Sequence, residues 1–423
     1  MTYEAMLQKL YNLKGSGLEL ERVVHALGDP QKSFRAIRVA GTNGKGSVCA
    51  FLAQILQEAG FRVGLFTSPH LVHPEERIRV NSREISPEEF QAQFERIWTV
   101  IEGIYGTESE RYARFFEVLT LMALEYFRAQ KVDWAVIECG VGARTDATRI
   151  VSAEVSVLTN VELDHTDSLG KTIAQIAYQK AAVVSEGGTL ITAEHKQEAL
   201  AEIARECRWK NARLIQLDLS RLHAKSNSWD GQRFDWRVWQ DLEISLLGNY
   251  QLQNAVLAIE AANALGERAI TESAIRAGLR KARWPGRMEL LHTNPYIMLD
   301  GAKNPAGMRA LRAALSSLKY ERCIVVLGIS DRKDAAAMIH EIVPIADHVI
   351  VTRASFRGVD PEYLASLIDG VPCTVAPSPE SAIKLALTQA RGGDLICVTG
   401  SLFLVGEVRA RWKGQEHFCK DPH

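Results

Sequence analysis

Short runs of apolar, often β-branched residues alternate with segments of helical periodicity along almost the whole chain. In the first half, the pattern predicts buried strands at 36–40, 62–67, 133–138, 155–161 and 190–192, and helices at 48–59, 87–101 and 116–130. Strands that alternate with helices in this way form a mostly parallel sheet covered by helices. Residues 213–247, where aromatic and polar residues alternate around Trp236, predict a short antiparallel meander instead.

A second alternation begins near Met288. It predicts strands at 296–299, 323–327, 348–351, 373–376 and 395–398, separated by helices at 305–318, 333–345, 360–369 and 379–391. Five strands with four crossovers make a complete doubly wound, Rossmann-like sheet. Pro285 and Gly286 interrupt the chain just before it, so we predict an α/β protein with domains at 1–287 and 288–423.

Composition narrows the class of protein. The chain has 423 residues, of which 47% are hydrophobic and 24% charged, as in soluble globular proteins of two or three domains. With 50 Lys and Arg against 51 Asp and Glu, nothing suggests a nucleic acid or a membrane surface as partner. Seven scattered cysteines without a C-x-x-C pair indicate neither a zinc site nor a disulfide framework. No signal peptide or membrane span is recognisable, so we expect a cytoplasmic protein.

The most specific local motif follows the first predicted strand. It consists of Gly41, Thr42, Asn43, Gly44, Lys45, Gly46 and Ser47, and a helix comes next. A glycine-rich turn between a strand and a helix presents backbone N–H groups to a phosphate, with Lys45 as a cation and Ser47 as a Mg²⁺ ligand. The strict G-x-x-x-x-G-K-[ST] pattern is not met, because Val39 replaces its first glycine and Gly46 separates the lysine from the serine. An ordinary glycine-rich turn is the alternative.

The same loop resembles that of the Mur ligase superfamily, in particular the folylpolyglutamate synthase/dihydrofolate synthase family. Other segments resemble that family in the same order, from about residue 20 to about residue 408, at 67–71, 76–80, 116–120, 138–148, 163–166, 179–181, 248–255, 285–287, 300–305 and 400–401. The resemblance implies an N-terminal P-loop-type ATPase domain and a C-terminal glutamate ligase domain. It also implies an amide ligase that adds L-glutamate to dihydropteroate or folates through an acyl phosphate.

The resemblance further implies which residues bind metal. Ser47 and Glu138 would hold one Mg²⁺ ion, and Ser68, Glu138 and His165 a second. From the pattern alone, Glu138 stands at the end of a buried strand, where α/β folds bind ligands. His165 is equally compatible with an ordinary turn histidine. Lys180 alone would be read as a solvated lysine on a helix at 174–184, but the family carries a carbamylated lysine there.

The remaining site residues are also implied by the resemblance. The catalytic set is Lys45, His165, Lys180 and Lys303. ATP would in addition be held by Asn254, Arg287 and Asp300. The acid and the amino acid would be contacted by Phe116, Asp146, Arg357 and Ser401. Because both predicted domains contribute, domain closure should assemble the site. We expect small-molecule substrates, ATP with two Mg²⁺ ions, no nucleic acid or membrane partner, and a monomer.

Five residues depart from the family's pattern. Lys303 replaces a usual histidine, Ala143 a glycine, Thr145 a leucine, Arg149 an asparagine and Val118 a frequent aromatic residue. The last four lie where the family contacts the pterin-bearing acid, so a ligase of the same fold with a different acid substrate is one alternative. A nucleotide-binding regulatory protein without chemistry is another, disfavoured because Lys45, Ser47, Glu138, His165 and Lys180 are all present.

Overall fold

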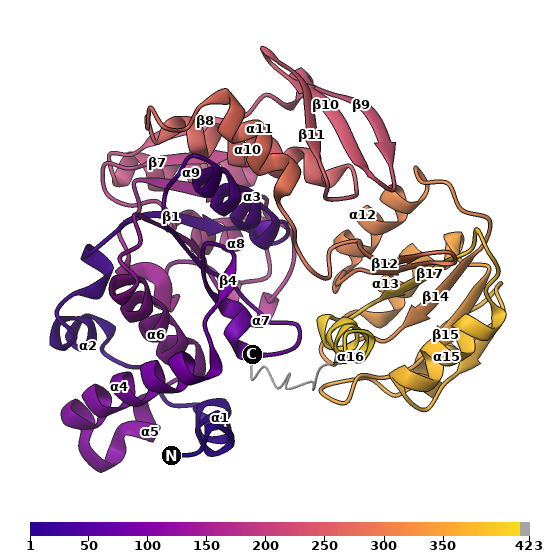
Figure 1. Ribbon diagram of the computed structural model, residues 1–423, viewed down its shortest axis with the longest axis horizontal. Helices are drawn as coiled ribbons and strands as arrows, with labels where there is room; N and C mark the ends of the chain where they lie inside the picture. The colour runs from indigo at the N-terminus through magenta and orange to yellow at the C-terminus, as the bar shows by residue number, and fades with distance from the viewer. Residues whose placement is uncertain (415–423) are drawn as a thin grey trace.

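Two β-sheets organise residues 1–414, the part of the chain that this computed structural model describes. The first has eight strands in the order β4-β3-β2-β5-β1-β6-β7-β8, and the second has six in the order β12-β13-β17-β14-β15-β16. Figure 1 shows the first sheet with its helices in the left half of the molecule and the second in the right half. The predicted α/β fold class, with two such sheets, is confirmed.

In the first sheet, β2, β5, β1, β6, β7 and β8 run parallel, while β3 and β4 return antiparallel at one edge. Its strands are β1 Arg35–Ala40, β2 Val63–Phe66, β3 Ile78–Val80, β4 Arg83–Glu84, β5 Trp134–Glu138, β6 Val155–Leu158, β7 Thr189–Thr192 and β8 Arg213–Gln216. The helices around it are α1 Tyr3–Asn12, α2 Leu20–Ala26, α3 Lys45–Glu58, α4 Pro87–Tyr105, α5 Ser109–Tyr112, α6 Phe115–Ala129, α7 Thr166–Leu169, α8 Ile173–Ala181, α9 Gln197–Trp209, α10 Tyr250–Ala264 and α11 Glu272–Lys281.

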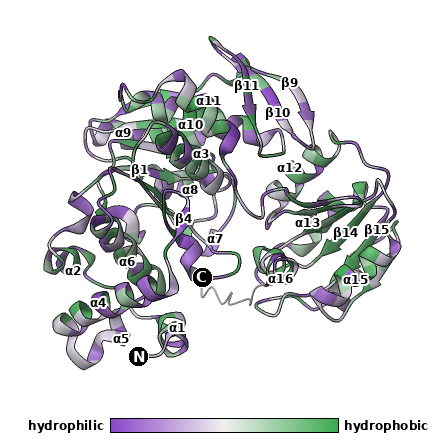
Figure 2. Ribbon diagram, in the orientation of Figure 1, coloured by the Kyte–Doolittle hydropathy of each residue, from purple (hydrophilic) through white to green (hydrophobic). Residues whose placement is uncertain are grey.

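Helices bury both faces of the central strands. Successive residues of a strand point to opposite faces, so Trp134 and Val136 pack with α3, α10 and α11, whereas Ala135 and Ile137 pack with α1, α4 and α6. A strand that is buried on both faces is largely apolar, and β14 (Cys323–Leu327) is accordingly hydrophobic along its length (Figure 2). β1 departs from this pattern with Arg38, which is buried in its interior. The polar residues of the candidate site, such as Glu138 on β5, lie at the strand ends.

The predicted meander is shorter than expected. It consists of β9 Leu222–Ser228, β10 Gly231–Trp236 and β11 Trp239–Ile244, which form a separate three-stranded antiparallel sheet. Its predicted first part was wrong, because residues 213–216 pair in parallel with β7 and end the large sheet. That strand is largely half-buried or exposed, as an edge strand is, so it lacks the apolar run of the central strands. The hairpin of β9 and β10 reaches the second sheet, where the Trp229 ring stacks on Tyr296 with 4.4 Å between centroids.

The second sheet contains the five predicted strands and one more. Its members are β12 Glu289–Thr293, β13 Tyr296–Leu299, β14 Cys323–Leu327, β15 His348–Val351, β16 Cys373–Val375 and β17 Leu395–Thr399. Its helices are α12 Pro305–Leu315, α13 Ala335–Ile342, α14 Pro361–Ser366, α15 Pro379–Gln389 and α16 Leu402–Trp412. The additional strand, β12, pairs antiparallel with β13 at the edge of the sheet. Its residues are half-buried or exposed, so it does not stand out as an apolar run.

The predicted second domain extends past the residues that the structure describes. Residues 415–423 of the predicted second domain, with Cys419, lie outside them. Within residues 1–414, every helix is too short or too polar to cross a lipid bilayer.

Candidate active site

The phosphate loop connects the end of β1 to the start of α3. The helix begins at Lys45, and Gly44 before it adopts a left-handed φ of 84°. Gly41 has a φ of 148°, and a Cβ atom there would lie 1.8 Å from the Thr159 hydroxyl oxygen. Lys45 Nζ donates to the carbonyl oxygens of Gly41 at 3.3 Å and Thr42 at 3.5 Å. The loop is thus a tight cradle around one ammonium group, as phosphate binding requires.

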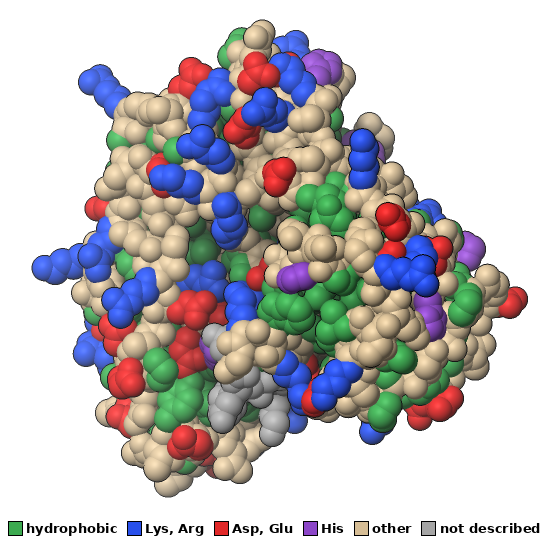
Figure 3. All heavy atoms as spheres, turned by 45° about the vertical axis from the view of Figure 1, so that its right-hand side comes forward, with side chains coloured by type: hydrophobic (Ala, Val, Ile, Leu, Met, Phe, Trp, Pro, Cys, Tyr) green, Lys and Arg blue, Asp and Glu red, His purple; other side chains and the backbone are tan. Residues whose placement is uncertain are grey.

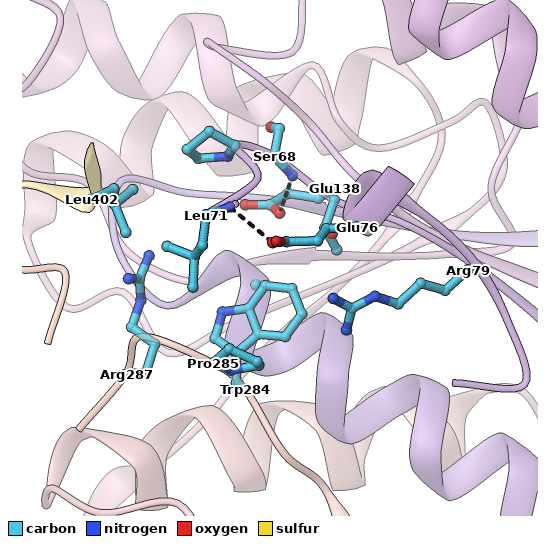
Figure 4. A pocket seen from close by; sticks show the side chains of 12 residues that line it. Ser68, Leu71, Glu76, Arg79, Glu138, Trp284, Pro285, Arg287 and Leu402 are labelled. Carbon is cyan, nitrogen blue, oxygen red and sulfur yellow. Dashed lines mark hydrogen bonds between the residues drawn. The ribbon is translucent and has the colours of Figure 1, made fainter. Parts of the chain in front are cut away.

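Glu138 ends β5 next to this loop. One of its carboxylate oxygens accepts the backbone N–H of Ser68 at 2.9 Å (Figure 4). The other oxygen lies 3.9 Å from Lys45 Nζ. Burial raises the pKa of Glu138, and the nearby Lys45 opposes that rise. A buried carboxylate of this kind is well suited to a divalent ion.

The donors at this end of the loop fit Mg²⁺. Ser47 lies in the first turn of α3, where its hydroxyl accepts from the Gln251 side chain at 3.2 Å. Together with Glu138 it offers hard oxygen ligands, which Mg²⁺ prefers. No three His, Cys, Asp or Glu side chains cluster as a metal site within residues 1–414. Phosphate oxygens and water would therefore complete the coordination, as is usual for Mg²⁺.

Lys180 reaches the phosphate loop from α8. Its Nζ donates to the Gly41 carbonyl oxygen at 2.8 Å, and its side chain is almost completely buried. Burial lowers the pKa of Lys180 to about 7, and the charge of Lys45 adds to the effect. The expectation from periodicity alone, a solvated lysine, was wrong, because this position faces the loop rather than the solvent.

His165 stands between β6 and α7 with a left-handed φ of 50°. Burial lowers the pKa of His165 to about 4; the neighbouring Asp164 opposes this shift, and Lys303 strengthens it. The imidazole is therefore neutral near pH 7, which is the form that can bind a metal ion.

Asp164 connects the phosphate loop to the second sheet. One of its carboxylate oxygens accepts from Lys333 Nζ at 2.9 Å, and the other accepts from the Asn304 side chain at 3.3 Å. The same Asn304 amide donates to the Asn43 side chain at 3.3 Å. Burial alone would raise the pKa of Asp164, but His165 and Lys333 lower it below its usual range. Lys303 lies close by, and burial lowers its pKa to about 8.

Residues 284–287, the hinge segment between the two halves, form the other wall of the site. A cavity is lined by Gly46, Ser68, Glu138, Trp284 and Arg287, among others (Figure 4). Figure 3 shows charged side chains of both signs gathered where the two halves of the molecule meet.

Two of the predicted nucleotide residues lie differently from each other. Asn254 on α10 would meet a Cβ atom added at Gly44 at 2.4 Å, so it contacts the phosphate loop. Asp300 is buried and accepts the backbone N–H groups of Met288 at 3.0 Å and Ala302 at 2.9 Å. Its carboxylate thus holds the hinge, and the structure does not place it in the lining of the cavity.

The predicted substrate residues form two groups, one in each half. The Asp146 carboxylate accepts from the backbone N–H of Gly140 at 3.0 Å, and the Phe116 ring lies 3.0 Å from a Cβ atom added at Gly140. In the other half, Ser401 contacts Ser330 hydroxyl to hydroxyl at 2.8 Å. Arg357 binds Asp331, the residue after Ser330, at 2.7 Å. Asp146 and Phe116 therefore meet at Gly140. Ser401 and Arg357 meet at the neighbouring residues Ser330 and Asp331.

Three residues of the site were not singled out in the sequence. Asn304 and Gln251 belong to recognised motifs but carried no assigned role, and Lys333 belongs to none. Their roles depend on contacts with residues 140 or more positions away. The local sequence gives no signal for Lys333.

Family models match most of the chain. The Mur ligase middle domain matches residues 39–262, and the Mur ligase, glutamate ligase domain, matches residues 286–402. A dihydrofolate synthase/folylpolyglutamate synthase from Bacillus subtilis is 35% identical over 407 residues, which cover 93% of this chain and 94% of the relative. A probable bifunctional folylpolyglutamate synthase/dihydropteroate synthase from Halobacterium salinarum is 37% identical over 92% of this chain, which spans only 48% of that relative.

Solved structures share the fold over the whole length. The Mycobacterium tuberculosis folylpolyglutamate synthase complexed with ADP has a TM-score of 0.90 and 29% identity, covering 99% of this chain and 100% of that one. The Escherichia coli FolC in complex with DHPP and ADP has a TM-score of 0.88 and 30% identity, covering 98% of both chains.

Proposed function

This chain belongs to the Mur ligase family as an ATP-dependent ligase of the folylpolyglutamate synthase/dihydrofolate synthase type, and we propose that it joins L-glutamate to dihydropteroate or a folate. The observation that carries this proposal is the meeting of the phosphate loop with Asn304 and Lys333 at Asp164. A nucleotide on the loop would lie against residues of the second domain. The second domain is where we propose that L-glutamate, the third substrate, binds. The domain boundaries we propose for this arrangement are 1–287 and 288–423.

The proposed reaction has two steps. A carboxylate oxygen of the pterin-bearing acid attacks the γ-phosphorus of ATP, so ADP leaves and an acyl phosphate forms. The amine of glutamate then attacks the acyl carbon, loses a proton and expels phosphate, which leaves an amide. Both steps move negative charge, so positioned cations are the main requirement.

Lys45 in the loop and Lys303 opposite it are such positioned cations. Lys45 and the loop N–H groups would bind the β- and γ-phosphates, with Lys303 on the second domain facing them. Mg²⁺, held by Ser47 and Glu138, would neutralise phosphate charge, and His165 and Ser68 are the proposed additional ligands of a second ion. Asn254 and Arg287 would hold the rest of the nucleotide.

We propose that Lys180 is carbamylated in the active protein. Its pKa of about 7 leaves a large neutral fraction at physiological pH, and only the neutral amine attacks CO₂. The new N–C bond releases one proton and replaces a cation near Lys45 by an anion. A carbon-13 resonance from labelled bicarbonate that is absent in the Lys180→Met variant tests this modification.

The residues proposed for the acid and for glutamate lie in different halves of the molecule. Phe116 and Asp146 are the proposed contacts of the pterin-bearing acid, and Arg357 and Ser401 those of the glutamate carboxylate, because an arginine suits a carboxylate in a bidentate contact. The E. coli enzyme was solved with DHPP, which supports a pterin-type acid here. A different acid is the second candidate, favoured by Lys303 and Arg149. A monomer and a cytoplasmic location remain predictions.

The deciding experiment measures phosphate release from ATP and Mg²⁺ by the purified protein with L-glutamate. Dihydropteroate, dihydrofolate and reduced folates are offered separately, and the products are weighed by mass spectrometry. We expect a product heavier by one glutamyl unit with at least one of these acids. If ATP binds but no pterin-type acid stimulates release, the pterin assignment is wrong and another acid is the substrate.

A further inference from the structure

A second cavity, of about 390 Å³, lies away from the proposed active site. It opens between the segment 143–152 and the C-terminal ends of α8 and α9, and it shares no lining residue with the cavity of Figure 4. Its cationic lining residues are Arg38, Arg144, Arg149 and Lys210. One carboxylate, Glu186, and the 72% exposed Trp209 complete its charged and aromatic lining.

Arg38 is the least expected of these residues. It lies within β1, only 2% exposed, and donates weakly to the Val183 carbonyl oxygen at 3.4 Å and the Thr148 hydroxyl at 3.3 Å. Within residues 1–414 no carboxylate oxygen lies within 4 Å of it, and its Nε–H has no hydrogen-bond acceptor. Buried arginines are nearly always paired, and an unsatisfied buried donor costs about 1–3 kcal/mol. The buried Asp146 carboxylate is linked to Arg38 through the Thr148 hydroxyl, so the guanidinium has this indirect partner and no direct ion pair within residues 1–414.

The other three cations have only two carboxylates to pair with. Arg144 and Lys210 share Glu206, at 2.5 Å and 3.5 Å. Arg149 lies 3.2 Å from Glu21, which is on the exposed surface. Burial lowers the pKa of Lys210, and Arg38 and Arg144 add to that shift. The cavity thus carries an excess of positive charge that its own walls do not balance.

A purely structural role accounts for part of the cluster. Lys210 Nζ donates to the carbonyl oxygens of Ala182 at 3.2 Å and Val184 at 2.5 Å, where it stabilises the C-terminal end of α8. That role does not require Arg38, because Arg38 lies in the interior of β1 and not at the end of a helix. Nor does it require Arg149, which pairs with Glu21 on the surface.

We propose that this cavity binds a small anion bearing a phosphate or carboxylate group, with Arg144 and Arg149 as its accessible ligands and Arg38 behind them. Guanidinium groups match both kinds of anion in bidentate contacts. Ala143 and Arg149, two of the residues that depart from the family's pattern, line this cavity. The proposed site goes beyond the ligase activity, and it rests on the lining of this cavity, not on the identity of the acid substrate.

The site is connected to the loop that follows Glu138. The Thr148 hydroxyl accepts from Arg38 and donates to Asp146, whose carboxylate in turn holds the Gly140 N–H. An anion that draws the Arg38 side chain toward the cavity would weaken its hydrogen bond to Thr148 and so affect the bonds from Thr148 and Gly140 to Asp146.

The test is isothermal titration calorimetry with inorganic phosphate and, separately, with glutarate, at constant ionic strength. Saturating Mg²⁺ and ADP fill the phosphate loop beforehand, so that binding there does not contribute. We expect one additional site in the wild type, and binding weaker by about tenfold or more in Arg149→Gln and in Arg38→Met. The control Arg213→Gln removes an exposed cation on β8 outside the cavity and should bind as the wild type does.

Each outcome decides the matter. Phosphate binding alone identifies a phosphate ligand, and glutarate binding alone identifies a carboxylate. Absence of binding by both probes, or equal affinity in the wild type and Arg149→Gln, overturns the proposal. Arg149 is partly exposed, so that variant carries the test if Arg38→Met does not fold by circular dichroism.

Discussion

At the scale of single residues, two lysines bind one backbone carbonyl in the centre of the site. The Gly41 oxygen accepts from Lys45 at 3.3 Å and from Lys180 at 2.8 Å. Two ammonium groups so close repel each other, and burial together with the charge of Lys45 lowers the pKa of Lys180 to about 7. Replacing Lys180 should therefore have consequences different from those of replacing Lys45.

Replacing Lys45 by methionine should lower the rate of ATP-dependent phosphate release about a hundredfold or more, because phosphoryl transfer relies on fixed cations. Steady-state kinetics measure the effect. Lys32→Met, which removes a lysine that is 73% exposed, serves as the control and should retain the wild-type rate. Equal rates in the two variants would remove Lys45 from the proposed chemistry.

Lys180 makes stability depend on pH. In the folded protein its pKa is lowered to about 7, whereas in the unfolded chain it has the ordinary lysine pKa of 10.5. Between these values the unfolded state binds more protons, so the free energy of unfolding should rise with pH. Urea unfolding at about pH 7 and about pH 9, in buffer free of bicarbonate, should show a larger gain in the wild type than in Lys180→Met. Identical gains would contradict the lowered pKa.

The same residue shows what sequence could reveal at this scale. Glu138 and Lys45 were identifiable because each follows an apolar strand at a position where α/β folds bind ligands. The periodicity of its helix predicts that Lys180 is solvated. Only the resemblance to the family indicated a role in the site. Lys333 gave no signal, since its partner Asp164 is distant in sequence and the contact exists only between the two halves.

At the scale of elements, the start of α3 packs against the hinge segment through a glycine. A Cβ atom at Gly46 would lie 2.6 Å from the Trp284 ring. The helix and the hinge can approach this closely only because position 46 has no side chain. The spacing between the phosphate loop and the hinge is therefore fixed at this contact.

Gly46→Ala should separate α3 from Trp284 and raise the KM for ATP about tenfold, since overpacking costs about 1–3 kcal/mol. The double variant Gly46→Ala with Trp284→Ala removes the ring and should recover part of the loss, a coupling that a double-mutant cycle measures. Additive effects of the two changes would show that the contact does not set the spacing.

The elements also separate what periodicity can predict from what it cannot. Central strands such as β5 and β14 are buried on both faces and form apolar runs, so they were found nearly to the residue. The edge strands β8 and β12 are half-buried and polar, and their identity depends on which neighbour they pair with. That choice is made by the whole sheet, so β8 was assigned to the meander and β12 was missed.

At the scale of the whole molecule, the two halves are joined by a buried ion pair. Asp164 and Lys333 are 8% and 19% exposed, and Asn304 binds both Asp164 and the phosphate loop. Breaking a buried pair by removing one partner leaves an uncompensated charge, which favours hydration of the interface. The relative position of the halves should therefore depend on this contact.

Lys333→Met should increase the radius of gyration of the ligand-free protein, measured by small-angle X-ray scattering. It should also expose the hinge near residue 285 to limited proteolysis. Lys384→Met removes a lysine of the same half that is 74% exposed and paired within α15, so it should leave both measurements unchanged. Matching scattering curves for the two variants would show that other contacts hold the halves together.

The cluster of lysines in the cleft also bears on how fast substrates arrive. Lys45, Lys303 and Lys333 lie close to one another around Glu138 and Asp164, although the chain as a whole carries a net charge of -1. A local excess of positive charge in a concave, low-dielectric site focuses the field outward and attracts anions before contact. A nucleotide and an acidic amino acid are both anions, so their encounter rates with the cleft should fall as salt shortens the range of that field.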